Sequence, residues 1–384
     1  MRILVAPDKF KGTLTASQAA DAVAAGWSRG RPLDEVELVP MADGGEGTMD
    51  ALVAALGGTV VPSRVTGPRG DPVEAAYGLV ETAEGLMGVV EMARASGLAL
   101  LAPSRRDPGR TSTQGTGELM VRALERGAER LLVCLGGSAT NDGGVGMASA
   151  LGYRFLDAGG APIEPGGAGL LGLHRIEASQ VHARVRWVTV TGACDVSNPL
   201  TGAAGASAVY GPQKGASPED ALVLDRALGH LAAVVHRDLG IAPKDEAGAG
   251  AAGGLGFGLL AFCGARLRPG VEVVMDALDL GTKIAAADLV ITGEGSLDAQ
   301  SLRGKVPSGV LTACALAGVP AVVVCGRSEL SATELAGRVG AAGVVIASLV
   351  DRVGEAPALE DARTALALVA EDLAASAGKL VGAI

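Results

Sequence analysis

The chain has 384 residues, which is more than one ordinary domain, and a formal net charge of −10. Hydrophobic residues make up 48% of it but aromatic residues only 2%, so the cores must be built from small aliphatic side chains, and an aromatic nucleic-acid platform is disfavoured. The acidic balance and the lack of an apolar run of roughly 18 residues predict neither a nucleic-acid nor a membrane partner.

The cysteines and the first residues bear on the compartment. The five cysteines are scattered, odd in number and free of any C-x-x-C pair, which is typical of reduced thiols. The opening MRILVAPDKFKG lacks the basic-then-apolar order of a signal peptide. We therefore expect a cytoplasmic protein, of an oligomeric state that the sequence does not reveal.

The first 60 residues predict alternating strands and helices. We expect a buried strand over 3–6, a helix over 15–28, a second strand over 36–41 and a second helix over 48–56. A β-α-β-α order of this kind implies a parallel sheet.

The middle of the chain has a different pattern of predicted secondary structure. Short alternating segments between residues 59 and 100, separated by Gly and Pro, are typical of antiparallel strands. Further on we expect helices over 114–127, 141–151 and 218–238, buried strands over 131–135 and 185–190, and a glycine-rich stretch over 248–258.

The strand–helix alternation returns near residue 287. We expect strands over 287–292, 320–325 and 343–348, and helices near 306–317, 331–339 and 357–377. The simplest fold is α/β with two domains. Residues 1–62 and 286–384 would form a discontinuous parallel-sheet domain, and residues 63–285 an inserted second α/β domain.

Polar loops follow five of the predicted strands, where parallel α/β sheets bind their ligands. These loops read PDKFKGTLTA, ADGGEGT, GGSATNDGG, TGACDVSNPL and GEGSLDAQSLRGK. They combine glycines, lysines and carboxylates, which are the parts that phosphoryl transfer needs. For Asp43, Glu46, Asp142 or Asp298 taken alone, a turn or helix cap explains the residue equally well.

Other motifs give weaker evidence of function. Gly248, Gly250 and Gly253 spell GxGxxG, but no clear strand precedes them, so we discount a dinucleotide site. There is no GxxxxGK[ST] loop and no G-x-S-x-G elbow, and the four histidines have no metal-ligand spacing.

Several long motifs resemble the type I glycerate kinase family. They include APDKFKGTLTA, PMADGGEGT, LGGSATNDGGVGMASALG, ACDVSNPLTGAAGASAVYGPQKGA and DLVITGEGSLDAQSLRGKVPSGV, in family order from residue 1 to about 375. The resemblance implies ATP-dependent phosphorylation of D-glycerate, with 2-phosphoglycerate favoured over 3-phosphoglycerate as the product. It also implies a flavodoxin-like domain, a second α/β domain, and an active site in the cleft between them.

Roles can be placed on the motif residues from the chemistry of such a reaction. Asp195 is the first choice for the general base that accepts the hydroxyl proton, and Asp298 is its rival. Lys9 and Lys11 suit the carboxylate of glycerate, and Lys9 also ranks among the catalytic residues. Lys214 would neutralise charge on the transferred phosphoryl group.

The remaining candidates concern ligand binding. We expect Asp8 and Asn198 to contact substrate, and Asp43 and Glu46 to hold Mg²⁺ that bridges ATP oxygens. The expected ATP-binding residues are Gly136, Gly137, Ser138, Gly293, Gly295, Ser296 and Lys305.

Three alternatives stay open. The chain could be a kinase of another small hydroxy acid, because a few pocket side chains decide the substrate. It could instead bind a phosphorylated metabolite without turnover, or be an NAD-dependent oxidoreductase supported only by the discounted glycine motif.

Overall fold

A computed structural model describes residues 1–302, 304–341 and 343–378. The chain divides into two compact units. Unit 1 joins Met1–Asp43 to Val271–Ile384, and unit 2 is Gly44–Gly270. Each unit is described by itself below.

The units meet earlier in the sequence than the expected 62/63 and 285/286 boundaries. Helix α2 (Thr48–Ala55) packs on strands of unit 2, and the backbone N–H of Met49 donates to Glu91 Oε1 at 2.8 Å. At the second junction, helix α10 (Leu280–Ala286) packs on the unit 1 elements β1 and α11.

Unit 1 is built on a five-stranded parallel sheet. Its strands are β1 (Arg2–Pro7), β2 (Glu35–Leu38), β11 (Leu289–Leu297), β12 (Ala321–Ser328) and β13 (Val345–Ser348). The spatial order is β13-β12-β11-β1-β2. Counted along unit 1, this is the flavodoxin-like order 2-1-3-4-5, so the predicted fold class is confirmed. The topological switch point lies between β1 and β11.

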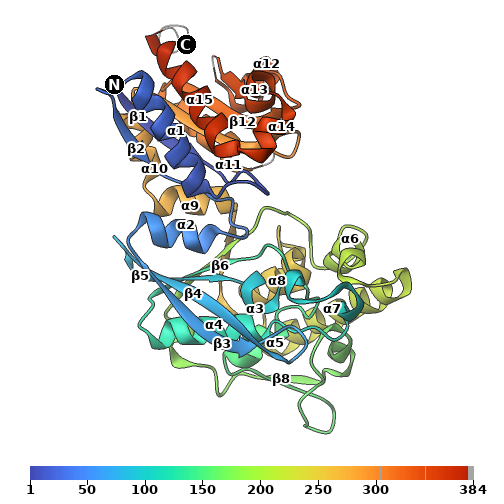
Figure 1. The fold of residues 1–384 in the computed structure, drawn as a ribbon. Coiled ribbons are helices and arrows are strands. Elements are labelled where there is room, and N and C mark those ends of the chain that lie inside the picture. The colour runs from blue at the N-terminus through green and yellow to red at the C-terminus, as the bar shows by residue number, and fades with distance from the viewer. Residues whose placement is uncertain (303, 342, 379–384) are drawn as a thin grey trace. The chain divides into compact units, whose positions relative to one another are not determined.

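Helices cover the sheet of unit 1. They are α1 (Ala16–Gly30), α9 (Gly270–Ala277, whose first residue belongs to unit 2), α10, α11 (Val306–Ala317), α12 (Ala332–Val339), α13 (Leu349–Val353), α14 (Glu355–Glu360) and α15 (Ala362–Ala375). Figure 1 shows α1 (blue) beside α15 (red), two helices from opposite ends of the chain that pack on each other. Alanines supply much of that contact, as the low aromatic content predicts.

Unit 2 contains a mixed six-stranded sheet in the order β10-β9-β6-β5-β4-β3. Its strands are β3 (Thr59–Thr66), β4 (Pro72–Thr82), β5 (Gly85–Glu91), β6 (Arg130–Cys134), β9 (Thr189–Ala193) and β10 (Arg266–Arg268). Strands β3, β4 and β5 are antiparallel, as predicted, whereas β5, β6, β9 and β10 are parallel. Strands β7 (Arg154–Leu156) and β8 (Arg175–Glu177) form a separate hairpin.

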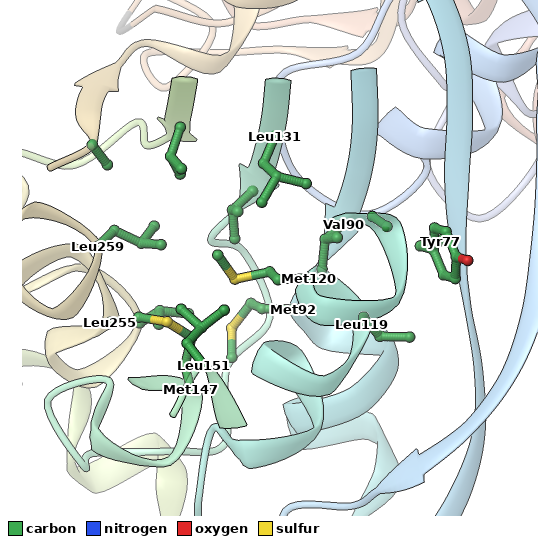
Figure 2. Close-up of a cluster of buried hydrophobic side chains, with 14 of the residues drawn as sticks. Tyr77, Val90, Met92, Leu119, Met120, Leu131, Met147, Leu151, Leu255 and Leu259 are labelled. Atoms are coloured by element: carbon green, nitrogen blue, oxygen red, sulfur yellow. The ribbon is translucent and has the colours of Figure 1, made fainter. Parts of the chain in front are cut away.

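The other helices of unit 2 are α3 (Ala93–Ser96), α4 (Gln114–Glu125), α5 (Val145–Ala150), α6 (Ala206–Tyr210), α7 (Pro218–Leu239) and α8 (Ala251–Cys263). Figure 2 shows the core that α3, α4, α5 and α8 share with the sheet. Leu131 of β6 and Val90 of β5 face Met120 of α4 and Leu255 of α8. The methionines and leucines fill the space that aromatic rings would occupy in a more ordinary core.

Several predicted segments differ from the structure. The helix expected over 141–151 begins only at Val145, and the helix expected over 357–377 is two helices, α14 and α15. The strand expected over 185–190 is a 3₁₀ turn, η4 (Ala183–Arg186), followed by β9. The glycine-rich stretch 248–258 leads into α8, and β11 continues five residues past its predicted end. None of the described helices is both long and apolar enough to span a membrane.

Candidate functional site

Unit 1 gathers charged side chains at its topological switch point. Asp8 follows β1 directly, and Glu294 lies in the neighbouring strand β11. The backbone N–H of Asp8 donates to the Gly293 carbonyl at 2.8 Å, which fixes the two segments side by side. Asp43 and Lys305 join them through an ion pair of 3.3 Å between Oδ2 and Nζ. We call Asp8, Asp43, Glu294 and Lys305 the switch-point cluster.

Burial changes the acidity of this cluster. The Asp8 residue is 4% exposed and Glu294 is 8% exposed. Burial and the charge of Asp43 raise the pKa of Asp8 to about 6. Burial, followed by the charges of Asp8 and Asp298, raises the pKa of Glu294 to about 7. Burial lowers the pKa of Lys305, but the surrounding carboxylates outweigh it and hold that pKa above its usual value.

One atom of the cluster is left without a hydrogen bond. Glu294 Oε1 is buried, and no described group donates to it. A buried polar atom without a partner costs stability, so such an atom at a strand end is a reason to look for a ligand.

The predicted lysines lie in a tight turn after β1. Phe10 and Leu14 close the turn with reciprocal backbone hydrogen bonds of 2.9 and 3.0 Å. Lys9 is half-buried and Lys11 is exposed. Lys11 therefore lies inside this turn, whereas Asp8 and Lys9 lie in the short segment between β1 and the turn.

The second half of β11 corrects one expectation. Gly293, Gly295 and Ser296 lie in a paired strand and not in a loop at a helix start, because Ser296 and Leu297 continue the pairing with β12. A Cβ on Gly293 would stand 2.0 Å from the Val324 carbonyl oxygen, so this glycine allows two strands to approach. These residues lie in a strand and not in the loop expected there, and their role in ATP binding stays a prediction.

The Asp298 side chain forms the hydrogen bonds of a turn. Its Oδ1 accepts from the backbone N–H groups of Gln300 at 2.7 Å and Ser301 at 3.3 Å. This is an Asx turn, the structural alternative that the sequence left open. The geometry disfavours Asp298 as a base.

Unit 2 has a pocket of about 400 Å³ at the carboxyl ends of β6 and β9. This is a size that small-molecule sites commonly have. It is lined by Gly44, Gly45, Leu98, Leu135, Gly136, Gly137, Ser138, Ala193, Cys194, Asp195, Val196, Tyr210, Gln213, Ala251 and Ala252. The structure thus brings together four of the predicted residues, Gly136, Gly137, Ser138 and Asp195.

The loop after β6 is a tight glycine turn. Gly137 has a φ of +72°, and its carbonyl accepts from the backbone N–H of Leu98 at 2.8 Å. A Cβ there would stand 2.8 Å from Glu46 Oε1. The loop of Gly136, Gly137 and Ser138 therefore requires glycine at its centre, and it carries the exposed Glu46 beside it.

Asp195 and Asn198 play different parts in this pocket. Asp195 is exposed, and its Oδ1 accepts from the backbone N–H of Gly270 at 2.9 Å. The Asn198 Oδ1 accepts from the Tyr210 hydroxyl and its Nδ2 donates to the Ala204 carbonyl, both at 2.8 Å. Asn198 therefore positions Tyr210 at the pocket wall.

Lys214 lies away from the pocket lining. It is 1% exposed, and its Nζ donates to the Thr140 carbonyl at 2.8 Å. Burial lowers the pKa of Lys214 to about 7, although the charge of Asp142 opposes this. Asp142 accepts from Thr113, Gly144 and Gly146. Lys214 and Asp142 are both buried outside the pocket lining, and the role of Lys214 at the transferred phosphoryl group stays a prediction.

The two predicted metal ligands fall in different units. Asp43 is in unit 1, paired with Lys305, whereas Glu46 is in unit 2 beside Gly137. Within the described parts of the chain, no group of three or more His, Cys, Asp or Glu could hold a metal ion. Magnesium in kinases usually needs only one or two carboxylates besides substrate phosphates.

Two residues of the candidate sites were not among the site residues predicted from the sequence. Tyr210 forms part of the pocket wall; it lies in one of the family motifs, but no charge or spacing separated it from the rest of that motif. Glu294 had a signal, since the GEG triplet follows a buried apolar run, but only its burial and its neighbours separate it from the other carboxylates.

Comparison with known proteins places these features in a family. Residues 3–377 match the model of the glycerate kinase family. The chain is 47% identical to glycerate kinase of Bacillus subtilis (strain 168) and 45% identical to glycerate 2-kinase of Escherichia coli (strain K12), in each case over 85% of both chains. A crystal structure from Salmonella typhimurium LT2, provisionally described as glycerate kinase 2, aligns with a TM-score of 0.88 at 44% identity. The alignment covers 99% of this chain and 98% of that one.

Proposed function

The chain belongs to the glycerate kinase family, and from this premise we propose that it transfers the γ-phosphoryl group of ATP to the 2-hydroxyl of D-glycerate. The products would be ADP and 2-phosphoglycerate. The observation that carries the choice of hydroxyl is the 45% identity to a relative named glycerate 2-kinase.

ATP would bind in the pocket of unit 2. Its glycine loop offers backbone N–H groups that phosphate can approach closely, and its volume of about 400 Å³ suits a nucleotide-sized ligand. Leu98, Val196 and Tyr210 supply apolar wall for a base and ribose. The Asn198 hydrogen bond would keep the Tyr210 ring in place.

Magnesium fits the carboxylates beside this loop. Glu46 lies against Gly137, and Asp195 lines the same pocket. These two side chains would hold Mg²⁺ together with phosphate oxygens. Bound there, the metal would neutralise charge that develops on the phosphate chain.

Glycerate would bind at the turn after β1. Its carboxylate needs cations, and Lys9, Lys11 and Lys305 lie at or near the switch point of unit 1. Its hydroxyls need acceptors, which Asp8 and Glu294 provide. Open α/β sheets bind their ligands at this position in general.

The test is ³¹P NMR of the purified protein with Mg-ATP and D-glycerate. We expect a phosphomonoester signal that requires both substrates. Its proton coupling separates the secondary ester of 2-phosphoglycerate from the primary ester of 3-phosphoglycerate. A primary ester would contradict the choice of hydroxyl.

The same experiment tests the substrate. If ATP stays intact, or yields only ADP and free phosphate, D-glycerate is not the acceptor. Other small hydroxy acids would then be screened under the same conditions, with omission of Mg²⁺ as the control for the metal requirement.

A further inference from the structure

We propose that Glu294 is the base that takes the proton from the glycerate hydroxyl, with Asp8 and Lys305 adjusting its strength. This deepens the proposed function and rests on it. It also moves the role of base from Asp195, in unit 2, to a residue that the sequence analysis did not select.

The first argument is position. Glu294 lies in β11, and Asp8 follows β1, the neighbouring strand on the other side of the switch point. The Asp8 and Glu294 side chains therefore lie close enough in unit 1 for their charges to interact, beside the segment that carries Lys9 and Lys11.

The second argument is the unpartnered oxygen. Glu294 Oε1 is buried, with no donor among the described residues. A substrate hydroxyl would supply the missing hydrogen bond, which is the geometry that a base needs before it accepts the proton.

The other carboxylates nearby are already engaged. Asp8 Oδ1 accepts from the backbone N–H of Lys9 at 2.7 Å, and Asp43 is paired with Lys305. Asp298 Oδ1 accepts two backbone N–H groups. The Ser301 side chain is hydrogen-bonded to the Glu294 carboxyl, but among the described residues Glu294 Oε1 is the buried oxygen of this group that has no partner.

Burial makes Glu294 a base near neutral pH, and the neighbouring charges adjust its pKa. Asp8 faces it from the end of β1, Lys305 from the start of α11, Asp298 from the end of β11, and Cys325 from β12. Burial contributes most to raising the pKa of Glu294 to about 7. A base of that strength has substantial basic form at pH 7 and still gains from accepting a proton.

The step conserves atoms and charge. The hydroxyl oxygen of glycerate bonds to the γ-phosphorus of ATP, and the bond from that phosphorus to the β,γ-bridging oxygen breaks. The hydroxyl proton passes to Glu294 Oε1. ADP leaves with the electron pair of the broken bond, and Glu294 returns the proton to water before the next turnover.

The experiment compares Glu294→Gln with Glu355→Gln, an exposed position on α14 that serves as the matched control. We expect Glu294→Gln to lower kcat by about 10²–10⁴-fold, with little change in KM for ATP, and the control to behave like wild type. The fall of kcat below about pH 7 in wild type should be absent from the residual activity of Glu294→Gln. Glu294→Asp should recover part of kcat.

Two further variants test whether the charges of Asp8 and Lys305 shift the pKa of Glu294. Asp8→Asn removes a negative neighbour and should move the acid limb of the kcat profile to lower pH, whereas Lys305→Met removes a positive one and should move it to higher pH. A purely structural role for Glu294 would not produce these opposite displacements.

Failure of the proposed function and failure of the inference about Glu294 give different results. If wild type makes no phosphoglycerate, the proposed function fails. If wild type is active and folded Glu294→Gln has a kcat within threefold of it, this inference alone fails. It fails equally if Glu294→Gln keeps the acid limb, or if Asp195→Asn loses it.

Discussion

At the scale of single residues, the most unusual feature is a carboxyl group kept where water does not solvate it. Glu294 is buried, and its oxygen Oε1 has no donor among the residues that the structure describes. Functional sites commonly contain groups that reduce the stability of the fold.

This cost gives a prediction for stability. The folded protein holds the Glu294 proton up to about pH 7, whereas the unfolded chain releases it near 4.5. Stability therefore falls as pH rises through this window, because the folded state binds the extra proton. Glu294→Gln should raise the free energy of unfolding of unit 1 at pH 8 by up to about 3 kcal/mol.

The measurement is urea unfolding at two pH values. Near pH 4, below the pKa of the unfolded chain, the difference between wild type and Glu294→Gln should nearly vanish, because the protonated acid resembles the amide. Glu355→Gln serves as the control at both. A destabilised Glu294→Gln at pH 8 would show that the carboxylate is better paired than the structure indicates.

Asp195 gives a second prediction at this scale. Asp195→Asn should lower kcat at least about 10²-fold and weaken binding of Mg-ATP, because the neutral amide is a poor partner for magnesium. Folding should be unaffected, since the side chain is exposed and the amide oxygen can still accept from Gly270.

Steady-state kinetics with varied Mg-ATP checks this. Asp245→Asn, an exposed position outside the pocket, is the matched control. Wild-type turnover in Asp195→Asn would remove this residue from the reaction, both as a metal ligand and as the base that the sequence favoured.

At the scale of elements, the start of α8 is the most constrained segment of unit 2. Ala252, Gly253 and Gly254 have φ values of +53°, +70° and +86°. Ala252 is one of the pocket-lining residues, so this left-handed run forms part of the candidate site.

Gly253→Ala should therefore destabilise unit 2. The added Cβ would stand 1.9 Å from the Thr140 carbonyl oxygen, in a backbone conformation that disfavours L side chains. We expect a loss of more than about 2 kcal/mol. Gly229→Ala, inside α7, meets only one atom at 4.0 Å and should stabilise the same unit by about 0.5–1 kcal/mol.

Chemical denaturation of both variants, followed by circular dichroism, measures the two changes in the free energy of unfolding, which should have opposite signs. Equal changes would mean that the left-handed segment 252–254 can move away from Thr140.

Local patterns were enough to predict the elements with strong periodicity. α1 and α7 lie within two residues of their expected bounds, because apolar spacing and caps such as Thr15 and Ser217 act locally. The length of β11 was not predictable, since it depends on pairing with β12, which lies later in the chain. Helix α8 was not predicted, because its many glycines have low helix propensity. Its close contacts nevertheless require small residues.

The candidate site was predictable to a similar degree. The rule that ligands bind at strand ends selected Asp8, Gly136 and Asp195, which the structure places at such ends. It did not separate Lys214 or Asp298 from them, because burial and turn hydrogen bonds appear only after folding.

At the scale of the whole molecule, the chain begins unit 1, builds unit 2, and then returns. Unit 2 is continuous in sequence and has its own cores of buried side chains. We therefore predict that residues 44–270 fold alone, whereas residues 1–270 fold only over their unit 2 part.

The two tryptophans make this measurable. Trp27, in unit 1, is 0% exposed, and Trp187, in unit 2, is 86% exposed. In the 1–270 fragment with Trp187→Phe, Trp27 should emit as a solvated residue, while circular dichroism still shows a cooperative urea transition. A blue-shifted Trp27, or no transition in the 44–270 fragment, would contradict the prediction.

The parallel pairing of β1 with β11 has a consequence for the nascent chain. Ile3 must wait for Leu289, its register partner, to leave the ribosome. At the usual rates of synthesis this delay is roughly 15–60 s. During that time the first strand lacks its neighbour and offers an open edge to other chains. Aggregation during translation should thus depend on how quickly the ribosome reaches the last third of the message.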